Sequence, residues 1–273
     1  MTASTFQLTD EIQAMRERIA YIGRLMFDRN LTDAGGGNIS ARVGDYVCIS
    51  QTLCGANHQW QITTDQVLVL DRQGNILVGD GKTSRETKVH LSLHNTYGEY
   101  GTGVIHGHPR NVMVFATAAQ ELPPVMEATR KFGVTPVIEY APAHSAKLAK
   151  YVTESMKGRE QRIAKHGAGT IAPWHGIFLM GRTLDAAFDA VERLDTNAFC
   201  ILQSRNLGIV GRSLLSRRCD AVFQFDHRES TVTPGLDKIP CQLSKSLIRG
   251  IRELTGVKAA DGFGFAGSTA MGP

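Results

Sequence analysis

Two histidines, His106 and His108, stand on either side of Gly107 and follow an apolar, β-branched run at residues 103–105. Such a run is typical of a buried strand, and side chains two positions apart on a strand point to the same face. Both imidazoles are therefore expected to look into one pocket. With His175 from a distant segment, they would supply three nitrogen ligands and leave a fourth position open, as in a catalytic zinc site. The alternative is that these are ordinary histidines among the nine in the chain.

A glycine-rich segment, residues 35–40, contains Gly35, Gly36 and Gly37, followed by Asn38 and Ser40. Glycines allow backbone amides to converge on an anion, and the two polar side chains add donors. No Lys-Ser or Lys-Thr pair follows, and the spacing is not G-x-G-x-x-G, so neither nucleotide-binding motif is present. The segment predicts an anion-binding loop, with a plain helix-to-strand connection as the alternative.

A third polar segment contains Thr83, Ser84, Arg85 and Glu86 and leads into a helical pattern. Thr83 or Ser84 is expected to cap that helix, and hydroxyls and free amides at a helix N-terminus suit an anion. Arg85 can add a bidentate contact to the same anion. Glu86 is then either a first-turn carboxylate favoured by the helix dipole or a general base.

The elements that must position these residues alternate between helical and strand-like periodicity. Residues 71–75 read as a hairpin-type turn, and Thr183 is a good N-cap for the last helix. The mixture predicts an α/β protein with α/β/α layers. We expect a catalytic domain at residues 8–208 and an extension at residues 209–273, whose glycine-rich end at 261–273 is flexible or a lid. The expected helices are 9–29, 86–97, 111–118, 145–155 and 183–203, and the expected strands are 39–43, 46–50, 67–70, 103–106, 137–140 and 177–180.

Composition excludes several classes of function. A net charge of +4, with 42% hydrophobic and 21% charged residues, is ordinary for a soluble globular protein. Basic runs are short, so no nucleic-acid partner is expected, and no apolar run reaches membrane-spanning length or resembles a signal peptide. The five cysteines form no C-x-x-C pair. They indicate a reducing compartment, and we expect a cytoplasmic protein.

The order of these motifs resembles the class II aldolase and adducin family of zinc-dependent sugar-phosphate aldolases, which includes fuculose-1-phosphate and rhamnulose-1-phosphate aldolases. The resemblance covers roughly residues 10–205 and implies a three-layer α/β/α fold around a mixed, mainly antiparallel sheet. It is carried by Gly36 to Ser40, by Ser84 to Glu86 with His90 four residues on, by His106-Gly107-His108, by His175-Gly176-Ile177, and by residues 181–188.

The resemblance implies a role for each matching residue. His106, His108 and His175 would hold Zn²⁺, although imidazoles also suit Mn²⁺ or Co²⁺. Glu86 would be the catalytic acid–base group. Glu127 would reach in from a neighbouring subunit of a homotetramer whose active sites lie between subunits, with a plain surface glutamate as the alternative. From the chemistry alone, either Glu127 or Tyr140 could supply the proton on the aldehyde side. The residues expected to bind the substrate are Gly37, Asn38, Thr52, Ser84 and Arg85.

The implied reaction makes or cleaves a carbon–carbon bond of a ketose 1-phosphate, with dihydroxyacetone phosphate and an aldehyde as the two parts. A metal ion stabilises the enediolate that forms, and a carboxylate near the reacting carbon moves the proton. The substrate partner would be a phosphorylated sugar or a hydroxy acid.

Two residues depart from the family pattern: Leu53 stands where a glycine is usual, and Arg85 where a small hydroxyl residue is usual. Arginine suits a carboxylate, so a decarboxylase or an epimerase on the same fold is the alternative function. A non-enzymatic adducin-like interaction module is disfavoured because the three histidines and Glu86 are retained. A zinc hydrolase is disfavoured by the glycine loop and by the lack of an H-E-x-x-H motif.

Overall fold

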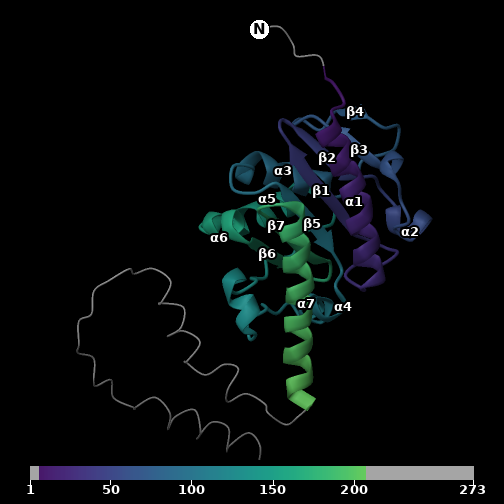
Figure 1. Ribbon diagram of the computed structural model, residues 1–273. Coiled ribbons are helices and arrows are strands. Elements are labelled where there is room, and N and C mark those ends of the chain that lie inside the picture. The colour runs from purple at the N-terminus through teal and green to yellow at the C-terminus, as the bar shows by residue number, and fades with distance from the viewer. Residues whose placement is uncertain (1–5, 207–273) are drawn as a thin grey trace, which may run out of the picture. The chain divides into compact units, whose positions relative to one another are not determined.

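The computed structural model describes residues 6–206 (Figure 1). Within them, seven strands form one sheet in the order β4-β3-β2-β1-β5-β7-β6, and every pair of neighbouring strands is antiparallel. The predicted α/β class with a mainly antiparallel sheet is confirmed. The strands are β1 (Asn38–Val43), β2 (Tyr46–Ser50), β3 (Val67–Leu70), β4 (Ile76–Val78), β5 (Gly103–Gly107), β6 (Gly167–Ala172) and β7 (Gly176–Gly181).

Helices cover both faces of the sheet, as the alternation of side chains along β5 requires. Ile105 belongs to the core shared with α1, α4 and α7, whereas Val104 belongs to a second core shared with α3, α5 and α6. The layers are therefore helix, sheet and helix. The helices are α1 (Asp10–Asp28), α2 (Cys54–His58), α3 (Thr87–Tyr97), α4 (Arg110–Thr117), α5 (Ala146–Ser155), α6 (Glu160–Lys165) and α7 (Leu184–Asn206), with 3₁₀ turns η1 (Thr64–Gln66) and η2 (Glu127–Phe132).

Local signals predicted several element ends correctly. The Thr183 hydroxyl accepts a hydrogen bond from the Ala186 amide at 3.1 Å and caps α7. In the turn between β3 and β4, the Asp71 carboxylate accepts the amides of Gln73 and Asn75, each at 2.9 Å. Gly74 has a φ of 94° there, which favours glycine.

Residues 137–140 are not the predicted strand. Only Val137 forms an isolated parallel bridge, to Ile171. The Ile171 amide donates to the Pro136 carbonyl at 2.8 Å, and the Ile171 carbonyl accepts from the Ile138 amide at 3.0 Å, which completes this one bridge. Extension in either direction would need an N–H from Pro136 or Pro173, and proline has none. The strand that lines this part of the sheet is β6, which begins Gly-Ala-Gly and was missed because small residues carry little strand signal.

The predicted cap of α3 is also wrong. Glu86, and not Thr83 or Ser84, occupies the N-cap position, and its side chain makes no capping bond. The Ser84 carbonyl instead accepts bonds from the Thr87 amide and hydroxyl. The Glu86 carboxylate is therefore free to point away from the helix.

The extension predicted at residues 209–273, with its glycine-rich end, lies outside the described residues. The domain boundary remains a prediction. Among residues 6–206, no helix is both long enough and apolar enough to cross a membrane.

Candidate active site

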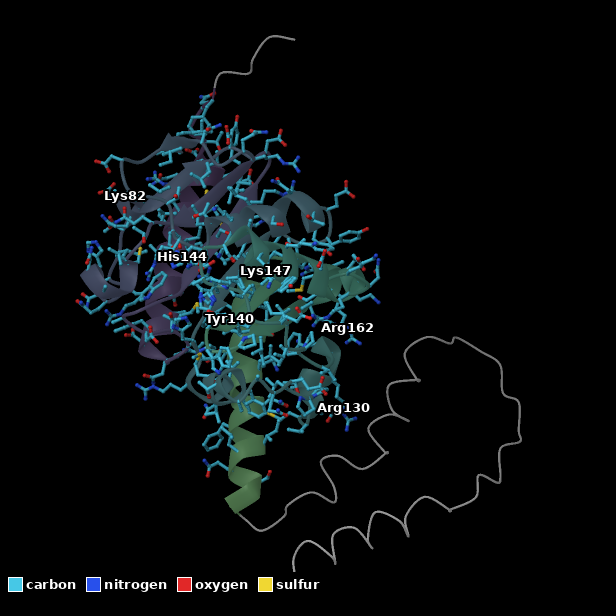
Figure 2. All side chains as sticks on the ribbon, turned by 180° about the vertical axis from the view of Figure 1, so that it is seen from behind. Lys82, Arg130, Tyr140, His144, Lys147 and Arg162 are labelled. Carbon is cyan, nitrogen blue, oxygen red and sulfur yellow. The ribbon has the colours of Figure 1, made fainter. Side chains whose placement is uncertain are left out.

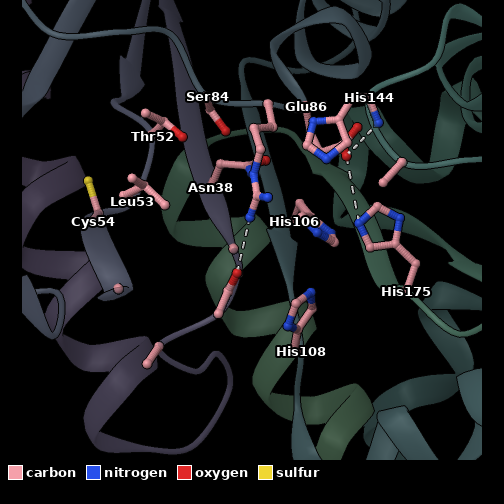
Figure 3. A pocket seen from close by; sticks show the side chains of 17 residues that line it. Asn38, Thr52, Leu53, Cys54, Ser84, Glu86, His106, His108, His144 and His175 are labelled. Carbon is pink, nitrogen blue, oxygen red and sulfur yellow. Dashed lines mark hydrogen bonds and ion pairs between the residues drawn. The ribbon is translucent and has the colours of Figure 1, made fainter. Parts of the chain in front are cut away.

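His106, His108 and His175 come together at the end of β5 (Figure 3). His106 lies on β5, His108 follows the strand, and His175 precedes β7, the antiparallel neighbour of β5. One nitrogen from each ring lies within 4.8 Å of the others. We call these residues the histidine triad, and their spacing meets the first requirement for a three-nitrogen metal site.

Hydrogen bonds outside the pocket orient the rings of His106 and His108. His106 Nδ1 lies 2.9 Å from the Ile177 carbonyl, so it must be the N–H donor and Nε2 carries the lone pair. His108 Nδ1 lies 3.1 Å from Asp33 Oδ2. His108 Nε2 and His175 Nδ1 are buried without a partner. A hydrogen-bond partner on the ring nitrogen that does not bind the ion, as Nδ1 has in His106 and His108, is typical of metal-binding histidines.

Burial favours the neutral form of two members of the triad, His106 and His175. It lowers the pKa of His106 well below its usual value, with smaller contributions from His175 and His108. Burial likewise lowers the pKa of His175 to about 4. Metal binding requires neutral imidazole, so the His106 and His175 rings are in the ligand-competent form at neutral pH. The donor set therefore fits a divalent ion such as Zn²⁺.

Glu86 enters the same pocket from the start of α3. Its Oε1 accepts the His144 amide at 3.0 Å and lies 3.7 Å from His175 Nε2, while Oε2 is buried without a partner. Burial raises the pKa of the Glu86 carboxyl, and the His144 amide opposes that shift. A buried carboxylate with one unused oxygen beside a metal-competent site is a strong candidate for a general base.

The glycine-rich segment has a different role from the one predicted for its amides. Asp33 Oδ1 accepts the amides of Gly35 at 2.8 Å and Gly36 at 2.9 Å, so these two amides are not free for a substrate anion. Because Asp33 Oδ2 also meets His108, one carboxylate ties the loop to the triad. A Cβ added at Gly36 would collide with the His108 ring.

Three of the predicted substrate residues, Asn38, Thr52 and Ser84, lie across the pocket from His175 (Figure 3). Asn38 lies directly across the β1–β5 ladder from His106. Arg85 also lines the pocket, and its guanidinium donates to the Gly35 carbonyl at 3.4 Å. All five residues, Gly37, Asn38, Thr52, Ser84 and Arg85, are in the lining.

Leu53, which stands where a glycine is usual in the family pattern, adopts a backbone conformation that favours glycine. Its φ is 63°, in the left-handed region, and its side chain is 47% exposed at the pocket. The bulk of leucine is therefore directed to solvent, and the loop keeps the path that a glycine would allow.

The two residues predicted as proton donors are not part of the pocket lining. Glu127 is exposed at the start of η2 and is not in the pocket lining. Tyr140 is 54% exposed and packs against Trp174, with ring centroids 5.2 Å apart. The structure of the single chain thus does not bring either proton-donor candidate to the triad.

Sequence reasoning missed Asp33 and His144. Asp33 stands two residues before the first loop glycine, a position from which its short side chain can bond the loop amides. His144 lies on the segment before α5, lines the pocket and has a φ of 66° (Figure 2). A histidine in that region is uncommon, but the sequence gives no sign of it.

Comparison with known proteins matches most of the chain to one family. Residues 17–202 match the family model described as Class II Aldolase and Adducin N-terminal domain. In solved structures, an L-fuculose 1-phosphate aldolase superposes with a TM-score of 0.64 at 21% identity, over 80% of this chain and 98% of that one. At that identity the likeness concerns the fold.

Three curated relatives are about equally similar to this chain in sequence, but their names specify different reactions. A methylthioribulose-1-phosphate dehydratase of Marinobacter nauticus is 28% identical over 69% of this chain and 92% of its own. An L-fuculose phosphate aldolase of Methanococcus maripaludis is 27% identical over 64% and 88%. A 3-oxo-tetronate 4-phosphate decarboxylase of Haemophilus influenzae is 27% identical over 71% and 90%.

Proposed function

The chain belongs to the class II aldolase and adducin family, and we propose that it is a metal-dependent carbon–carbon lyase acting on a ketose 1-phosphate. Cleavage would give dihydroxyacetone phosphate and an aldehyde, and the reverse reaction would join them. The observation that carries this proposal is Glu86, a buried carboxylate with a raised pKa and an unpartnered oxygen, 3.7 Å from a histidine of the triad. Proton removal next to a carbonyl requires a basic carboxylate of this kind.

The histidine triad would hold Zn²⁺, or Mn²⁺ or Co²⁺. The ion supplies Lewis-acid polarisation of the carbonyl and stabilises negative charge on its oxygen. Three neutral imidazoles leave the full charge of the ion available. Glu86 would take the proton from the carbon beside the carbonyl and return it, and the His144 amide holds its Oε1 in position. Little rearrangement of the carboxylate is then needed during reaction.

The opposite side of the pocket would bind the phosphate through neutral donors. Thr52 and Ser84 supply hydroxyls and Asn38 a carboxamide, with the Arg85 guanidinium at the rim. The names of all three relatives specify phosphorylated substrates, although their reactions differ. That agreement supports a phosphate at this end and leaves the bond that breaks to be tested.

Arg85 favours one alternative, a decarboxylase of an oxo or hydroxy acid. It is an exposed cation at the pocket where the family pattern has a small hydroxyl residue. A guanidinium binds a carboxylate bidentately, and one relative is named as a decarboxylase of an oxo acid phosphate. An epimerase would use the same base and metal.

Deuterium exchange on dihydroxyacetone phosphate tests the role of Glu86. The metal-loaded wild type should incorporate deuterium from heavy water, observed by NMR. Glu86→Gln should abolish exchange and keep its metal, because glutamine still offers an acceptor to the His144 amide but is not a base. The exposed Glu121 provides the matched control, and Glu121→Gln should exchange normally.

Two outcomes would overturn parts of this proposal. If Glu86→Gln loses its metal and exchange survives, Glu86 is a ligand and not the base. If the wild type fails to exchange dihydroxyacetone phosphate but releases carbon dioxide from a panel of phosphorylated oxo or hydroxy acids, the decarboxylase is correct. Metal analysis in each case shows whether the site was loaded.

We further propose a homotetramer in which Glu127 acts on a neighbouring subunit's site. Support comes from the exposure of Glu127 and its position outside the pocket of its own chain, together with the exposed Tyr140–Trp174 pair. Exposed aromatic residues are typical of protein interfaces. Light scattering should give the mass of four chains, whereas a monomer with full activity would exclude the role of Glu127 in trans.

A further inference from the structure

A line of hydrogen bonds runs behind the pocket, between β1 and α3. Asn38 Oδ1 lies 2.6 Å from His90 Nε2, and His90 Nδ1 lies 2.6 Å from Ser40 Oγ. Ser40 Oγ also lies 2.8 Å from His94 Nε2. None of the four side chains is more than 5% exposed. We call Asn38, His90, Ser40 and His94 the buried relay. Of its members, only Asn38 lines the pocket.

When the Ser40 hydroxyl donates to one of the two rings, the protons in the buried relay can be arranged in only two directions. Burial lowers the pKa of His90 and of His94 to about 3, so both rings are neutral and each has one donor and one acceptor nitrogen. In the first direction, His94 donates to Ser40, Ser40 to His90, and His90 to the Asn38 oxygen. In the second, every bond is reversed and the Asn38 nitrogen donates to His90.

The far end of the buried relay distinguishes these directions. His94 Nδ1 is buried without a partner. The first direction leaves a lone pair on that atom, whereas the second leaves an N–H, and orphaned buried N–H groups are the rarer and costlier case. The first direction is therefore favoured.

Arg42 favours the same direction. Its charge is among the causes that lower the pKa of His94, and its Nε–H is itself buried without an acceptor. The first direction places one unused donor and one unused acceptor in this region. The second direction would leave two unused donors beside a positive charge.

We propose that the buried relay is a positioning device, which holds the Asn38 carboxamide with its oxygen inward and its Nδ2 toward the pocket. The anionic group of the substrate then meets two N–H donors beside the hydroxyls of Thr52 and Ser84. Without the buried relay, the carboxamide can turn over and present its oxygen, which repels an anion. Ser40, His90 and His94 would thus set anion affinity without touching the substrate. The inference rests on the proposed function only in requiring that the pocket binds an anion.

A double-mutant cycle tests the buried relay. Ser40→Ala removes the hydroxyl that both imidazoles need. Binding of inorganic phosphate, and of glycolate as a carboxylate, is measured by calorimetry on the metal-loaded full chain. Ser40→Ala should weaken binding by about tenfold, the effect of about one hydrogen bond to a charged group. In an Asn38→Ala background it should have no effect, because the group that it positions is gone.

Thr170→Val is the matched control. Thr170 is a buried hydroxyl in β6 that donates to the Pro136 carbonyl at 3.1 Å. Its loss should reduce stability and leave anion affinity unchanged in both backgrounds. This comparison separates a positioning role from a general loss of buried hydrogen bonds.

A second pair of variants covers the case in which Ser40→Ala does not fold. His90→Gln keeps a side-chain N–H near the Asn38 oxygen, whereas His90→Met removes it. The proposal expects His90→Gln to bind anions more tightly than His90→Met.

Several outcomes would overturn the proposal. The first is an equal loss of anion affinity on Ser40→Ala in the wild-type and Asn38→Ala backgrounds, and the second is no loss in either background. The others are equal anion affinity of the two His90 variants, or no binding of either anion to the wild type. Anion binding needs no turnover. A protein that shows the expected coupling but exchanges no dihydroxyacetone phosphate therefore refutes the proposed function alone.

Discussion

The histidine triad and the buried relay meet at the β1–β5 ladder, where His106 of the triad pairs with Asn38 of the relay, yet the ring nitrogens of the two regions have different partners. Burial lowers the pKa of the rings in both regions. In the buried relay, three of the four ring nitrogens are hydrogen-bonded to Asn38 or Ser40. In the triad, His108 Nε2 and His175 Nδ1 remain without a partner.

This contrast shows that neither burial nor a low pKa identifies a metal ligand. Both properties follow from removing the ring from water. A ligand needs, in addition, a lone pair that no hydrogen bond occupies and that converges with others. The triad meets this condition, and the buried relay does not.

The largest expected effect is loss of the metal ion when the histidine triad is changed, with retention of the ion when the buried relay is changed. His106→Ala together with His108→Ala should lower metal affinity by more than about 100-fold, because losing an outer-shell partner alone costs about 10–100-fold. His94→Gln should retain about one ion per chain, as the wild type should. Elemental analysis after dialysis gives the metal content, and a double variant that keeps its ion would contradict the assignment.

The second prediction concerns the stability of the folded protein in acid, which depends on the two histidines of the buried relay. In the unfolded chain a histidine binds a proton near pH 6.5, whereas His90 and His94 do so only near pH 3. The unfolded state thus takes up more protons as the pH falls between these values, and the folded state is destabilised. Each ring contributes about 1.4 kcal/mol per pH unit.

Urea unfolding of the metal-free protein between pH 6 and pH 4 measures this slope. His94→Gln should reduce it by about 1.4 kcal/mol per pH unit, the share of one histidine. Thr170→Val, which removes a buried hydroxyl that does not titrate in this range, serves as the control and should leave the slope unchanged. An unchanged slope in His94→Gln would mean that His94 is charged in the folded protein.

A third prediction concerns the partner that orients His108. Asp33→Asn keeps an acceptor for the loop amides but replaces the carboxylate oxygen that faces His108 Nδ1. Metal affinity should fall by about 10–100-fold. Asp65→Asn, at an exposed carboxylate of η1, should not change it. Competition with a chelator measures both, and equal affinities would remove Asp33 from the site.

The smallest effect is expected at Leu53, which lines the pocket but belongs to neither region. A left-handed conformation costs a non-glycine residue about 1–2 kcal/mol, and the flexibility of unfolded glycine offsets about half of that. Leu53→Gly should therefore stabilise the protein by up to about 1 kcal/mol. Leu77→Gly, in β4, should destabilise it instead. Thermal unfolding would show the opposite signs, and metal content should not change in either variant.

Much of the fold was predictable because its signals are local. The helical repeat of α1, the cap of α7 and the turn at residues 71–75 depend on residues close in sequence. Residues 137–140 have the composition of a strand, but a strand needs a partner, and Pro136 and Pro173 lack the N–H groups that would extend the single bridge. The sequence also contains little sign of β6, the strand to which Val137 forms its single bridge.

The candidate site, like the fold, has features that the sequence determined and features that only the tertiary structure decided. Residue type, spacing and motif order determined the metal-ligand candidates, Glu86 and the family, because each is a property of the chain read in order. Only the tertiary structure decided which ring nitrogens are unused and that Asp33 occupies two loop amides. Those facts depend on partners distant in sequence, such as Ile177 for His106 and Ser40 for His90. A hydrogen bond forms only when folding brings both partners within about 3 Å of each other.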